Sequence, residues 1–201
     1  MRARTCKAGG QPAVARRGFL RALLVAVALC AGSQPAPARD EPAEAAEQRI
    51  KAAFLYKFGS YVDWPDSTFD SPDSPFVIGV MGAEVLARDL EQIVAGRQVA
   101  GREIRVRRMA PEEAPAGVQI LFIGHALSDR VRGIVEAAAG QPILTVTEEE
   151  GVPAPGSIIN FVVVGNKVRF DIALSAARLG QLRISARLLA VARNVINGGE
   201  S

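Results

Sequence analysis

The segment Val118-Gln-Ile-Leu-Phe-Ile123, followed by a helical pattern over Leu127–Ala139 and by Ile143-Leu-Thr-Val-Thr147, decides the fold class. The two short apolar runs are typical of buried strands. The residues between them repeat at helical spacing, and Ser128 or Asp129 is suited to open the helix. A strand, a helix and a second strand at this spacing predict a parallel crossover.

The same order of elements occurs upstream. Phe76-Val-Ile-Gly-Val-Met81 predicts another buried strand, and Gly82 separates it from an amphipathic helix that ends near Gly96. The stretch Val99–Met109 alternates apolar residues with arginines. This alternation predicts a strand near a sheet edge, with one of its faces in water.

The last third of the chain predicts an antiparallel hairpin. Ile158–Val164 and Val168–Ile172 are joined by Gly165-Asn166, two residues that tolerate the positive φ of a tight turn. The first strand is read as apolar throughout. The second strand alternates, so its apolar residues are expected to face inward and its charged residues outward, namely Lys167, Arg169 and Asp171.

Three further helices complete the pattern. The first ends at Trp64-Pro65 and places Lys51 away from its apolar face, which comprises Ile50, Phe54, Phe58 and Tyr61. The other two are Leu174–Gly180 and Ser185–Val195, with Ser185 as a cap. Together the elements predict the α/β class. We expect a single-domain layered sandwich with a mostly parallel sheet of about six strands, a C-terminal antiparallel hairpin and about five flanking helices.

The first 38 residues have the composition of a cleaved export signal. A basic region precedes the apolar run Ala22–Ala31, and the small residues Ala36-Pro37-Ala38 offer a cleavage site. As a helix this run is about 15 Å long, about half the hydrocarbon thickness of a membrane, so we expect no membrane insertion after cleavage. Arg16-Arg17 resembles a twin-arginine motif, and the twin-arginine route and the general export route both stay open. The chain is therefore expected to be exported.

Cleavage of residues 1–38 would leave 39–46 as a flexible N-terminus, 47–197 as one α/β domain and 198–201 as a tail. Both cysteines, Cys6 and Cys30, belong to the export signal. The mature chain therefore has no disulfide and no thiol chemistry.

The charge balance argues against a nucleic-acid-binding protein. All 21 acidic residues lie beyond position 38, and six of the 24 basic residues precede it, which leaves 18 minus 21, or −3. The mature chain is therefore mildly acidic. It lacks the basic stripe that nucleic-acid binding requires.

Residues that could support catalysis are sparse. His125 is the single histidine, which excludes a multi-histidine zinc site, and no Gly-x-Ser-x-Gly elbow accompanies it. Gly79-Val-Met-Gly82 lacks the third glycine of a nucleotide loop. The carboxylates of Glu112-Glu113 and Glu148-Glu149-Glu150 could hold a cation, but runs of this kind are usually solvated. We predict no catalytic residue, no metal site and no cofactor.

Aromatic residues are concentrated between Phe54 and Trp64. Most share one face of the first helix, as core residues do, but Tyr56 and Trp64 need not point the same way. These two are candidates for an exposed contact patch or for the rim of a small apolar pocket. Packing in the core is the alternative for each.

Segments spread over the mature chain resemble the YfiR family in order and spacing. They are Lys51-Ala-Ala-Phe-Leu-Tyr-Lys-Phe58 with Trp64-Pro65, Leu121-Phe-Ile123, Pro142-Ile-Leu-Thr-Val146, Gly156–Phe161, Arg169-Phe-Asp-Ile172 and Ser185-Ala-Arg-Leu-Leu-Ala-Val-Ala192. The resemblance implies a small exported α/β protein of the bacterial periplasm without established enzymatic activity. The best-understood member represses an inner-membrane diguanylate cyclase by binding its periplasmic sensor domain, which lowers cyclic di-GMP and biofilm formation. Members of the family can also form homodimers.

Two departures from the family pattern stand out. The best-known member has disulfides tied to stability and redox control, whereas the mature chain has no cysteine, so thiol-based sensing is excluded. Pro155-Gly156 stands where relatives often carry two glycines, which makes the entry to the hairpin stiffer.

The resemblance leads us to expect a regulator that binds the periplasmic domain of a diguanylate cyclase or a sensor kinase. Its contacts are expected near Tyr56 and Trp64 and around Arg187. The alternative class is a periplasmic protein that binds a small molecule and reports it to a membrane sensor such as a histidine kinase.

Overall fold

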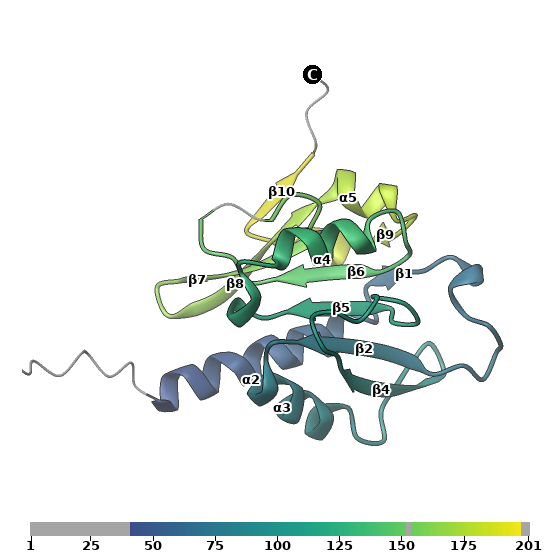
Figure 1. Ribbon diagram of the computed structural model, residues 1–201, viewed down its shortest axis with the longest axis horizontal. Coiled ribbons are helices and arrows are strands. Elements are labelled where there is room, and N and C mark those ends of the chain that lie inside the picture. The colour runs from purple at the N-terminus through teal and green to yellow at the C-terminus, as the bar shows by residue number, and fades with distance from the viewer. Residues whose placement is uncertain (1–40, 152–153, 198–201) are drawn as a thin grey trace, which may run out of the picture. The chain divides into compact units, whose positions relative to one another are not determined.

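The computed structural model describes residues 41–151 and 154–197, so the predicted export signal 1–38 and tail 198–201 lie outside the described residues. One eight-stranded sheet runs in the order β10-β8-β7-β6-β5-β2-β4-β3 (Figure 1). Its strands are β2 (Phe76–Met81), β3 (Gln98–Val99), β4 (Arg102–Arg108), β5 (Ile120–Ile123), β6 (Leu144–Thr147), β7 (Ile159–Val164), β8 (Lys167–Ala173) and β10 (Asn194–Ile196). Two short strands, β1 (Val62–Asp63) and β9 (Arg183–Ile184), form a separate antiparallel pair.

Five neighbouring strands, β4, β2, β5, β6 and β7, are parallel. β8 returns antiparallel to β7, and β10 lies parallel to β8 at the far edge. The α/β class, the mainly parallel sheet and the C-terminal hairpin are therefore confirmed. The sheet is wider than the six strands expected because the two-residue β3 and the three-residue β10 extend its two edges.

Helices cover both faces of the sheet. They are α2 (Glu41–Phe58), α3 (Glu84–Val94), α4 (Val131–Ala138), α5 (Leu174–Leu179) and α6 (Ala186–Leu189). α2 and α3 pack on one face, where Phe58, Phe122 and Phe161 lie in the larger core. α4 lies on the other face over a smaller core that includes Leu121 and Ile134. No helix among the described residues has the length and apolar character needed to cross a membrane.

The hairpin turn has the geometry expected from its sequence. Gly165 and Asn166 both adopt positive φ, 54° and 59°, and Val164 pairs with Lys167. Two residues at positive φ match the right-handed twist of the flanking strands. The prediction that Val168, Phe170 and Ile172 face inward is also confirmed, because all three are buried.

The side-chain pattern of this hairpin differs from the prediction at two positions. Asp171 was expected to face outward, but it is only 4% exposed and is bound by Arg193. Asn160 interrupts the strand read as apolar throughout, and it is 1% exposed. Both polar side chains are tolerated in the interior because each has hydrogen-bond partners there.

The first helix begins earlier than predicted and has a different buried face. α2 starts at Glu41, within the segment 39–46 that was expected to be flexible, and this segment is rich in alanine and glutamate, which favour helix. Ile50 is 46% exposed and Lys51 is 4% exposed, the reverse of the expected orientation. The buried face runs through Ala52, Leu55 and Phe58, and Lys51 is buried beside it because acidic groups compensate its charge.

The C-terminal helix is much shorter than predicted. Ser185 caps it as expected by accepting the N–H of Leu188, but α6 ends at Leu189. Asn194–Ile196 instead forms β10 beside β8. Val195 and Ile196 are β-branched, which favours a strand, and the N–H of Arg193 is directed to the carbonyl of Phe170 at 2.8 Å.

Candidate functional site

The usual ligand site of a doubly wound sheet lies beyond the carboxyl ends of the strands, where the strand order reverses. In this sheet that place lies between β2 and β5, from which the chain continues to opposite sides. The glycines that follow these strands touch: a Cβ added to Gly124 would lie 2.5 Å from the carbonyl oxygen of Gly82. Leu127 covers Gly82 from the other side, at 2.7 Å from a Cβ added there. The strand-to-helix junction is therefore a packed turn and not a cradle for phosphate, as the missing third glycine predicted.

A polar cluster occupies the same edge of the sheet, one strand further along. Lys51 of α2 pairs with Glu148, which follows β6, and with Glu47 one turn earlier in the helix. The Glu148 side chain is 9% exposed, and its second oxygen accepts the backbone N–H of His125 at 2.8 Å. Glu148 was expected to be solvated. The structure corrects this, because α2 brings a lysine to it from 97 residues away.

The charge of Lys51 is retained in this cluster. Burial alone lowers the pKa of a lysine, but the attraction of Glu148 and the hydrogen bonds that Lys51 donates to Glu148 and Glu47 outweigh burial. The pKa of Lys51 is therefore raised above its ordinary value. A protonated lysine cannot act as a general base or as an amine nucleophile. The pair therefore acts as an electrostatic link between α2 and the end of β6.

His125 lies beside a serine and a carboxylate, but their order does not suit catalysis. The Ser128 hydroxyl lies 3.1 Å from His125 Nδ1 and 3.0 Å from Glu149 Oε1. A catalytic triad needs the histidine between the nucleophile and the carboxylate, whereas here the serine stands between them. His125 is exposed and is the first residue of a short 3-10 turn, His125–Leu127, as expected for a loop histidine.

The remaining polar groups at this edge satisfy one another. Thr147 bonds to Ser157 at 2.9 Å and to Asn160 at 2.8 Å. The Asn160 amide bonds both the N–H and the carbonyl of Glu149, at 2.8 and 3.0 Å. Within residues 41–151 and 154–197, no group of three or more histidine, cysteine or acidic side chains could hold a metal ion. This network holds the strand ends in place.

The predicted contact residues lie on different elements. Tyr56 is half-buried on α2, with the Arg97 guanidinium 5.1 Å from its ring centroid. Trp64 is also half-buried: its ring meets Phe76 edge-on at 5.0 Å, and its Nε1 donates to the Gln119 carbonyl at 3.3 Å. Arg187 is exposed on α6. The β1–β9 pair brings the chain before Trp64 and the chain before α6 side by side.

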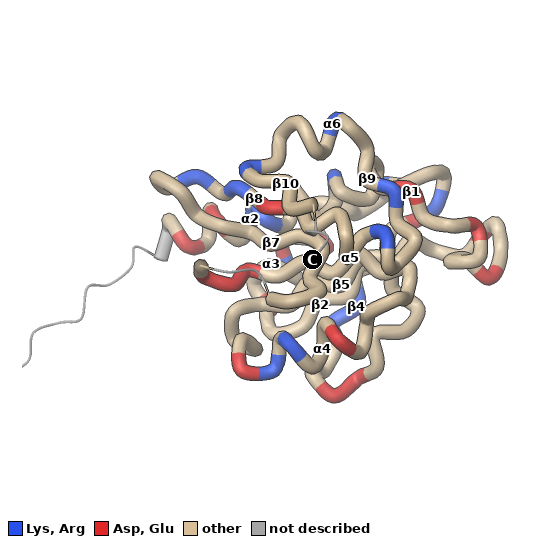
Figure 2. The backbone as a smooth tube through the Cα atoms, turned by 90° about the horizontal axis from the view of Figure 1, so that it is seen from above, with Lys and Arg blue, Asp and Glu red and all other residues tan. Residues whose placement is uncertain are grey.

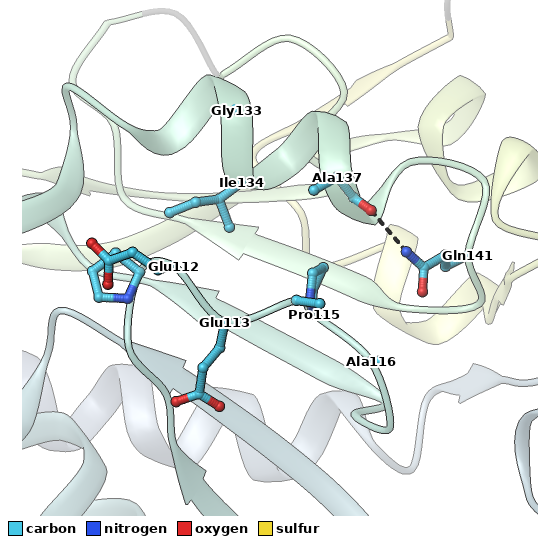
Figure 3. A pocket seen from close by; sticks show the side chains of 10 residues that line it. Glu112, Glu113, Pro115, Ala116, Gly133, Ile134, Ala137 and Gln141 are labelled. Carbon is cyan, nitrogen blue, oxygen red and sulfur yellow. Dashed lines mark hydrogen bonds between the residues drawn. The ribbon is translucent and has the colours of Figure 1, made fainter.

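A shallow pocket of about 300 Å³ lies between α4 and the loop 111–116 (Figure 3). Ile134 and Ala137 of α4 and Pro115 of the loop give it an apolar lining. Its polar side chains already have partners within the protein. Glu112 pairs with Arg130, Glu113 pairs with Arg107, and the Gln141 amide donates to the Ala137 carbonyl. The hydrogen bond from Arg130 lowers the pKa of Glu112, and the N–H of Ala110, followed by Arg107, lowers that of Glu113.

Sequence reasoning missed a set of exposed apolar side chains in the last part of the chain. Of the eight large apolar side chains that are exposed in the described part of the chain, six lie between Val163 and Ile196. They are Val163, Val164, Leu179, Val191, Val195 and Ile196. Their concentration near the end of the chain is visible in the sequence. Their exposure cannot be read from the sequence, because helical and strand periodicity predict an inner face for several of them.

These features define a small α/β domain with a mainly parallel, helix-flanked sheet. The sequence matches the family model described as YfiR/HmsC-like over residues 48–193, and the chain belongs to this family. No curated protein matches the sequence. One solved structure that it resembles is an ABC domain in complex with L-Trp from Streptococcus pneumonia, at 12% identity and a TM-score of 0.45, covering 60% of this chain and 55% of that one. The chain thus spans about half the length of that structure, and a TM-score this low supports no conclusion.

Proposed function

We propose that this protein is a periplasmic regulator without catalytic activity of its own, which binds the periplasmic sensor domain of an inner-membrane diguanylate cyclase and represses it. Membership of the YfiR/HmsC-like family over residues 48–193 carries this proposal. The composition of residues 1–38, typical of an export signal, supports the periplasmic location. Repression then requires that the protein bind the inactive arrangement of the cyclase more tightly than the active one.

The described site supports a binding role. Lys51 is held protonated between two carboxylates, and His125 does not stand between a nucleophile and an acid. The turn between β2 and α3 is filled by its own backbone and by Leu127. Among the predicted contact residues, exposed Arg187 suits a contact with a partner. Tyr56 and Trp64 could contribute their exposed edges.

The proposal is tested in the organism that encodes the chain. Deleting the gene should raise cyclic di-GMP and surface attachment, and expressing the full chain should reverse both. Expressing a chain without residues 2–38 should not reverse them, because it would stay in the cytosol. Unchanged cyclic di-GMP in the deletion strain would refute the proposal.

A pull-down experiment separates the two expected classes of protein, the cyclase regulator and the small-molecule-binding protein. The purified mature form should recover a cyclase with a periplasmic domain from membrane extract. Recovery of a sensor kinase, together with a small molecule that raises the melting temperature of the isolated protein, would instead favour the small-molecule-binding class.

A further inference from the structure

Positive charge is concentrated in the C-terminal part of the domain. Residues 167–197 contain six basic residues and one acidic residue, Asp171. That one acid is buried and bound by Arg193, so it does not offset the charge of the surface. The other five basic side chains are exposed, and they are Lys167, Arg169, Arg178, Arg183 and Arg187. Within the described residues, Arg183 alone of these five has an acidic group within 4 Å, Asp63 at 3.7 Å.

The rest of the described chain has the opposite charge. Residues 41–166 contain 11 basic and 18 acidic residues, or −7, whereas residues 167–197 carry 6 minus 1, or +5. In Figure 2, basic segments lie at β8, α5, β9 and α6. The domain is therefore electrically polarised, with its positive side at the edge formed by β10.

This positive edge is also an open sheet edge. β10 pairs with β8 on one side, and it has no strand on its other side among the described residues. All three residues of β10 are exposed. Open edges present unpaired N–H and C=O groups on which another chain can pair as an added strand.

The hydrogen-bond pattern identifies which backbone groups are available. Ala173 donates its N–H to the Ile158 carbonyl, on the β7 side, so the backbone groups of Ile172 face β10. Ile172 is the partner of Val195, and in a parallel ladder such a residue bonds to the two neighbours of its partner. Asn194 and Ile196 therefore bond toward β8. The N–H and C=O of Val195 point outward.

From these observations we propose that the β10 edge docks an extended acidic segment of the membrane partner, and this inference rests on the proposed function. The backbone of Val195 pairs with the segment. Carboxylates of the segment bind Arg178 and Arg187, and its apolar side chains cover Leu179 and Ile196. α5, which carries Arg178 and Leu179, packs against β10, and α6 leads directly into that strand. Charge selects an acidic partner, and the unpaired strand edge favours a peptide over a lipid surface.

The first experiment is photo-crosslinking in cells. Benzoylphenylalanine replaces either Ile196 or, as the control, Val85, which is similarly exposed at 46% on α3. The full chain with residues 1–38 is expressed and the crosslinked peptides are sequenced. We expect the position of Ile196, and not that of Val85, to capture an Asp/Glu-rich peptide from the periplasmic domain of a cyclase. Capture of that domain from the position of Val85 alone would overturn the inference and leave the proposed function intact. Capture of no cyclase from either position would contradict the proposed function itself.

The second experiment measures binding of the captured domain to the purified mature protein. Val195→Pro removes the outward N–H and should weaken binding about tenfold or more, whereas Val195→Ala keeps it and should bind nearly as well. Arg178→Glu with Arg187→Glu should weaken binding by at least about tenfold, and more at low salt. Arg132→Glu, an exposed charge reversal on α4, is the matched control. Melting temperatures should stay within a few degrees of wild type for the charge variants.

Three results would overturn the inference even where the cyclase binds. One is that the variant with both charge reversals and the Val195→Pro variant bind the cyclase domain as tightly as wild type does. Another is that the position of Ile196 crosslinks mainly to a second copy of this chain. The third is that the mature protein sediments with vesicles of anionic phospholipid, and Arg178→Glu with Arg187→Glu abolishes that sedimentation while leaving cyclase binding unchanged.

Discussion

Lys51 in the second half of α2 and Glu148 at the end of β6 form a buried ion pair, with Nζ and Oε2 2.5 Å apart. The pair joins the longest described helix to the carboxyl edge of the sheet. Its lysine keeps a second partner in Glu47, and its glutamate keeps the N–H of His125. Because both side chains are largely removed from water, neither charge is tolerated well without the other.

A double-mutant cycle tests this dependence. We expect Lys51→Met to lower the free energy of unfolding by about 3 kcal/mol, because it leaves Glu148 charged and unpaired. Glu148→Gln should cost about 1–3 kcal/mol, since Glu47 still compensates the lysine. The loss of unfolding free energy in the double variant should be smaller than the sum of the two single losses by about 1 kcal/mol or more. Additive losses in urea unfolding would show that the pair is not coupled.

The pH dependence of stability follows from the raised pKa of Lys51. A raised pKa in the folded state means that the stabilisation is fully present below the unfolded value, about 10.4 for lysine. It is lost as the pH rises through the higher folded value. We therefore expect wild type and the Lys51→Met/Glu148→Gln variant to differ by a constant amount from about pH 6 to about pH 9, and this difference to shrink only once the pH rises above the unfolded value of about 10.4. Convergence near neutral pH would contradict the raised pKa.

Gly124 and Gly133 offer a matched pair of glycine substitutions. Gly124→Ala places a Cβ 2.5 Å from the Gly82 carbonyl oxygen, a backbone atom that cannot move aside, so we expect a loss of about 2–3 kcal/mol. Gly133 lies in α4 with nothing within 4 Å of its added Cβ. Gly133→Ala should therefore raise stability by up to about 1 kcal/mol. Thermal unfolding of both variants measures the difference. If Gly124→Ala did not lower stability, the loop at Gly124 would not be in contact with the loop at Gly82.

Arg193 and Asp171 hold the edge strand to the sheet. Arg193→Ala leaves a carboxylate that is 4% exposed with Asn194 as its remaining described partner, so we expect the variant to unfold at a lower temperature than wild type. Arg187→Ala, on an exposed helix nearby, should change stability by less than about 0.5 kcal/mol. Hydrogen exchange of residues 193–196 should become faster in Arg193→Ala and stay unchanged in Arg187→Ala. Unchanged exchange in both would show that the ion pair does not fix β10.

Substitutions of Trp64 distinguish a role in core packing from a role in contact with the partner. Trp64→Phe keeps a ring against Phe76 and loses the bond to the Gln119 carbonyl, so we expect a loss of about 1 kcal/mol. Trp64→Ala should cost about 3 kcal/mol. If Trp64 only packs, Trp64→Phe should bind the partner as well as wild type does. Binding that falls about tenfold in Trp64→Phe would make its exposed edge a contact.

Some features of this fold follow from local pattern. The apolar run Phe76–Met81 forms β2, and the run Val118–Ile123 contains β5, because every residue of a central parallel strand faces a covered side. Even so, Gln119 lies inside the second run, buried, with its side chain accepting the N–H of Val77 at 2.7 Å. The periodicity of the run does not reveal that interaction. It depends on where a neighbouring strand begins.

The candidate site was the least predictable part. Tyr56 and Trp64 were selected for their aromatic character, and the structure places each against a neighbour from another element, Arg97 and Phe76. The basic edge at β10 was not predicted, because Asn194–Ile196 continues a segment with helical spacing. A strand at the edge of a sheet is determined by the strand beside it, which here is 23 residues earlier in the chain.

The sequence by itself determined the α/β class, the parallel crossovers and the turn at Gly165-Asn166, because these depend on side-chain periodicity and on backbone freedom within a few residues. Only the tertiary structure decided that Lys51 and Asp171 are buried and that the last residues form an open edge. A charged side chain is buried where another element brings a compensating charge, and an edge strand forms where a neighbour offers free backbone groups. Neither condition is recorded in the local sequence.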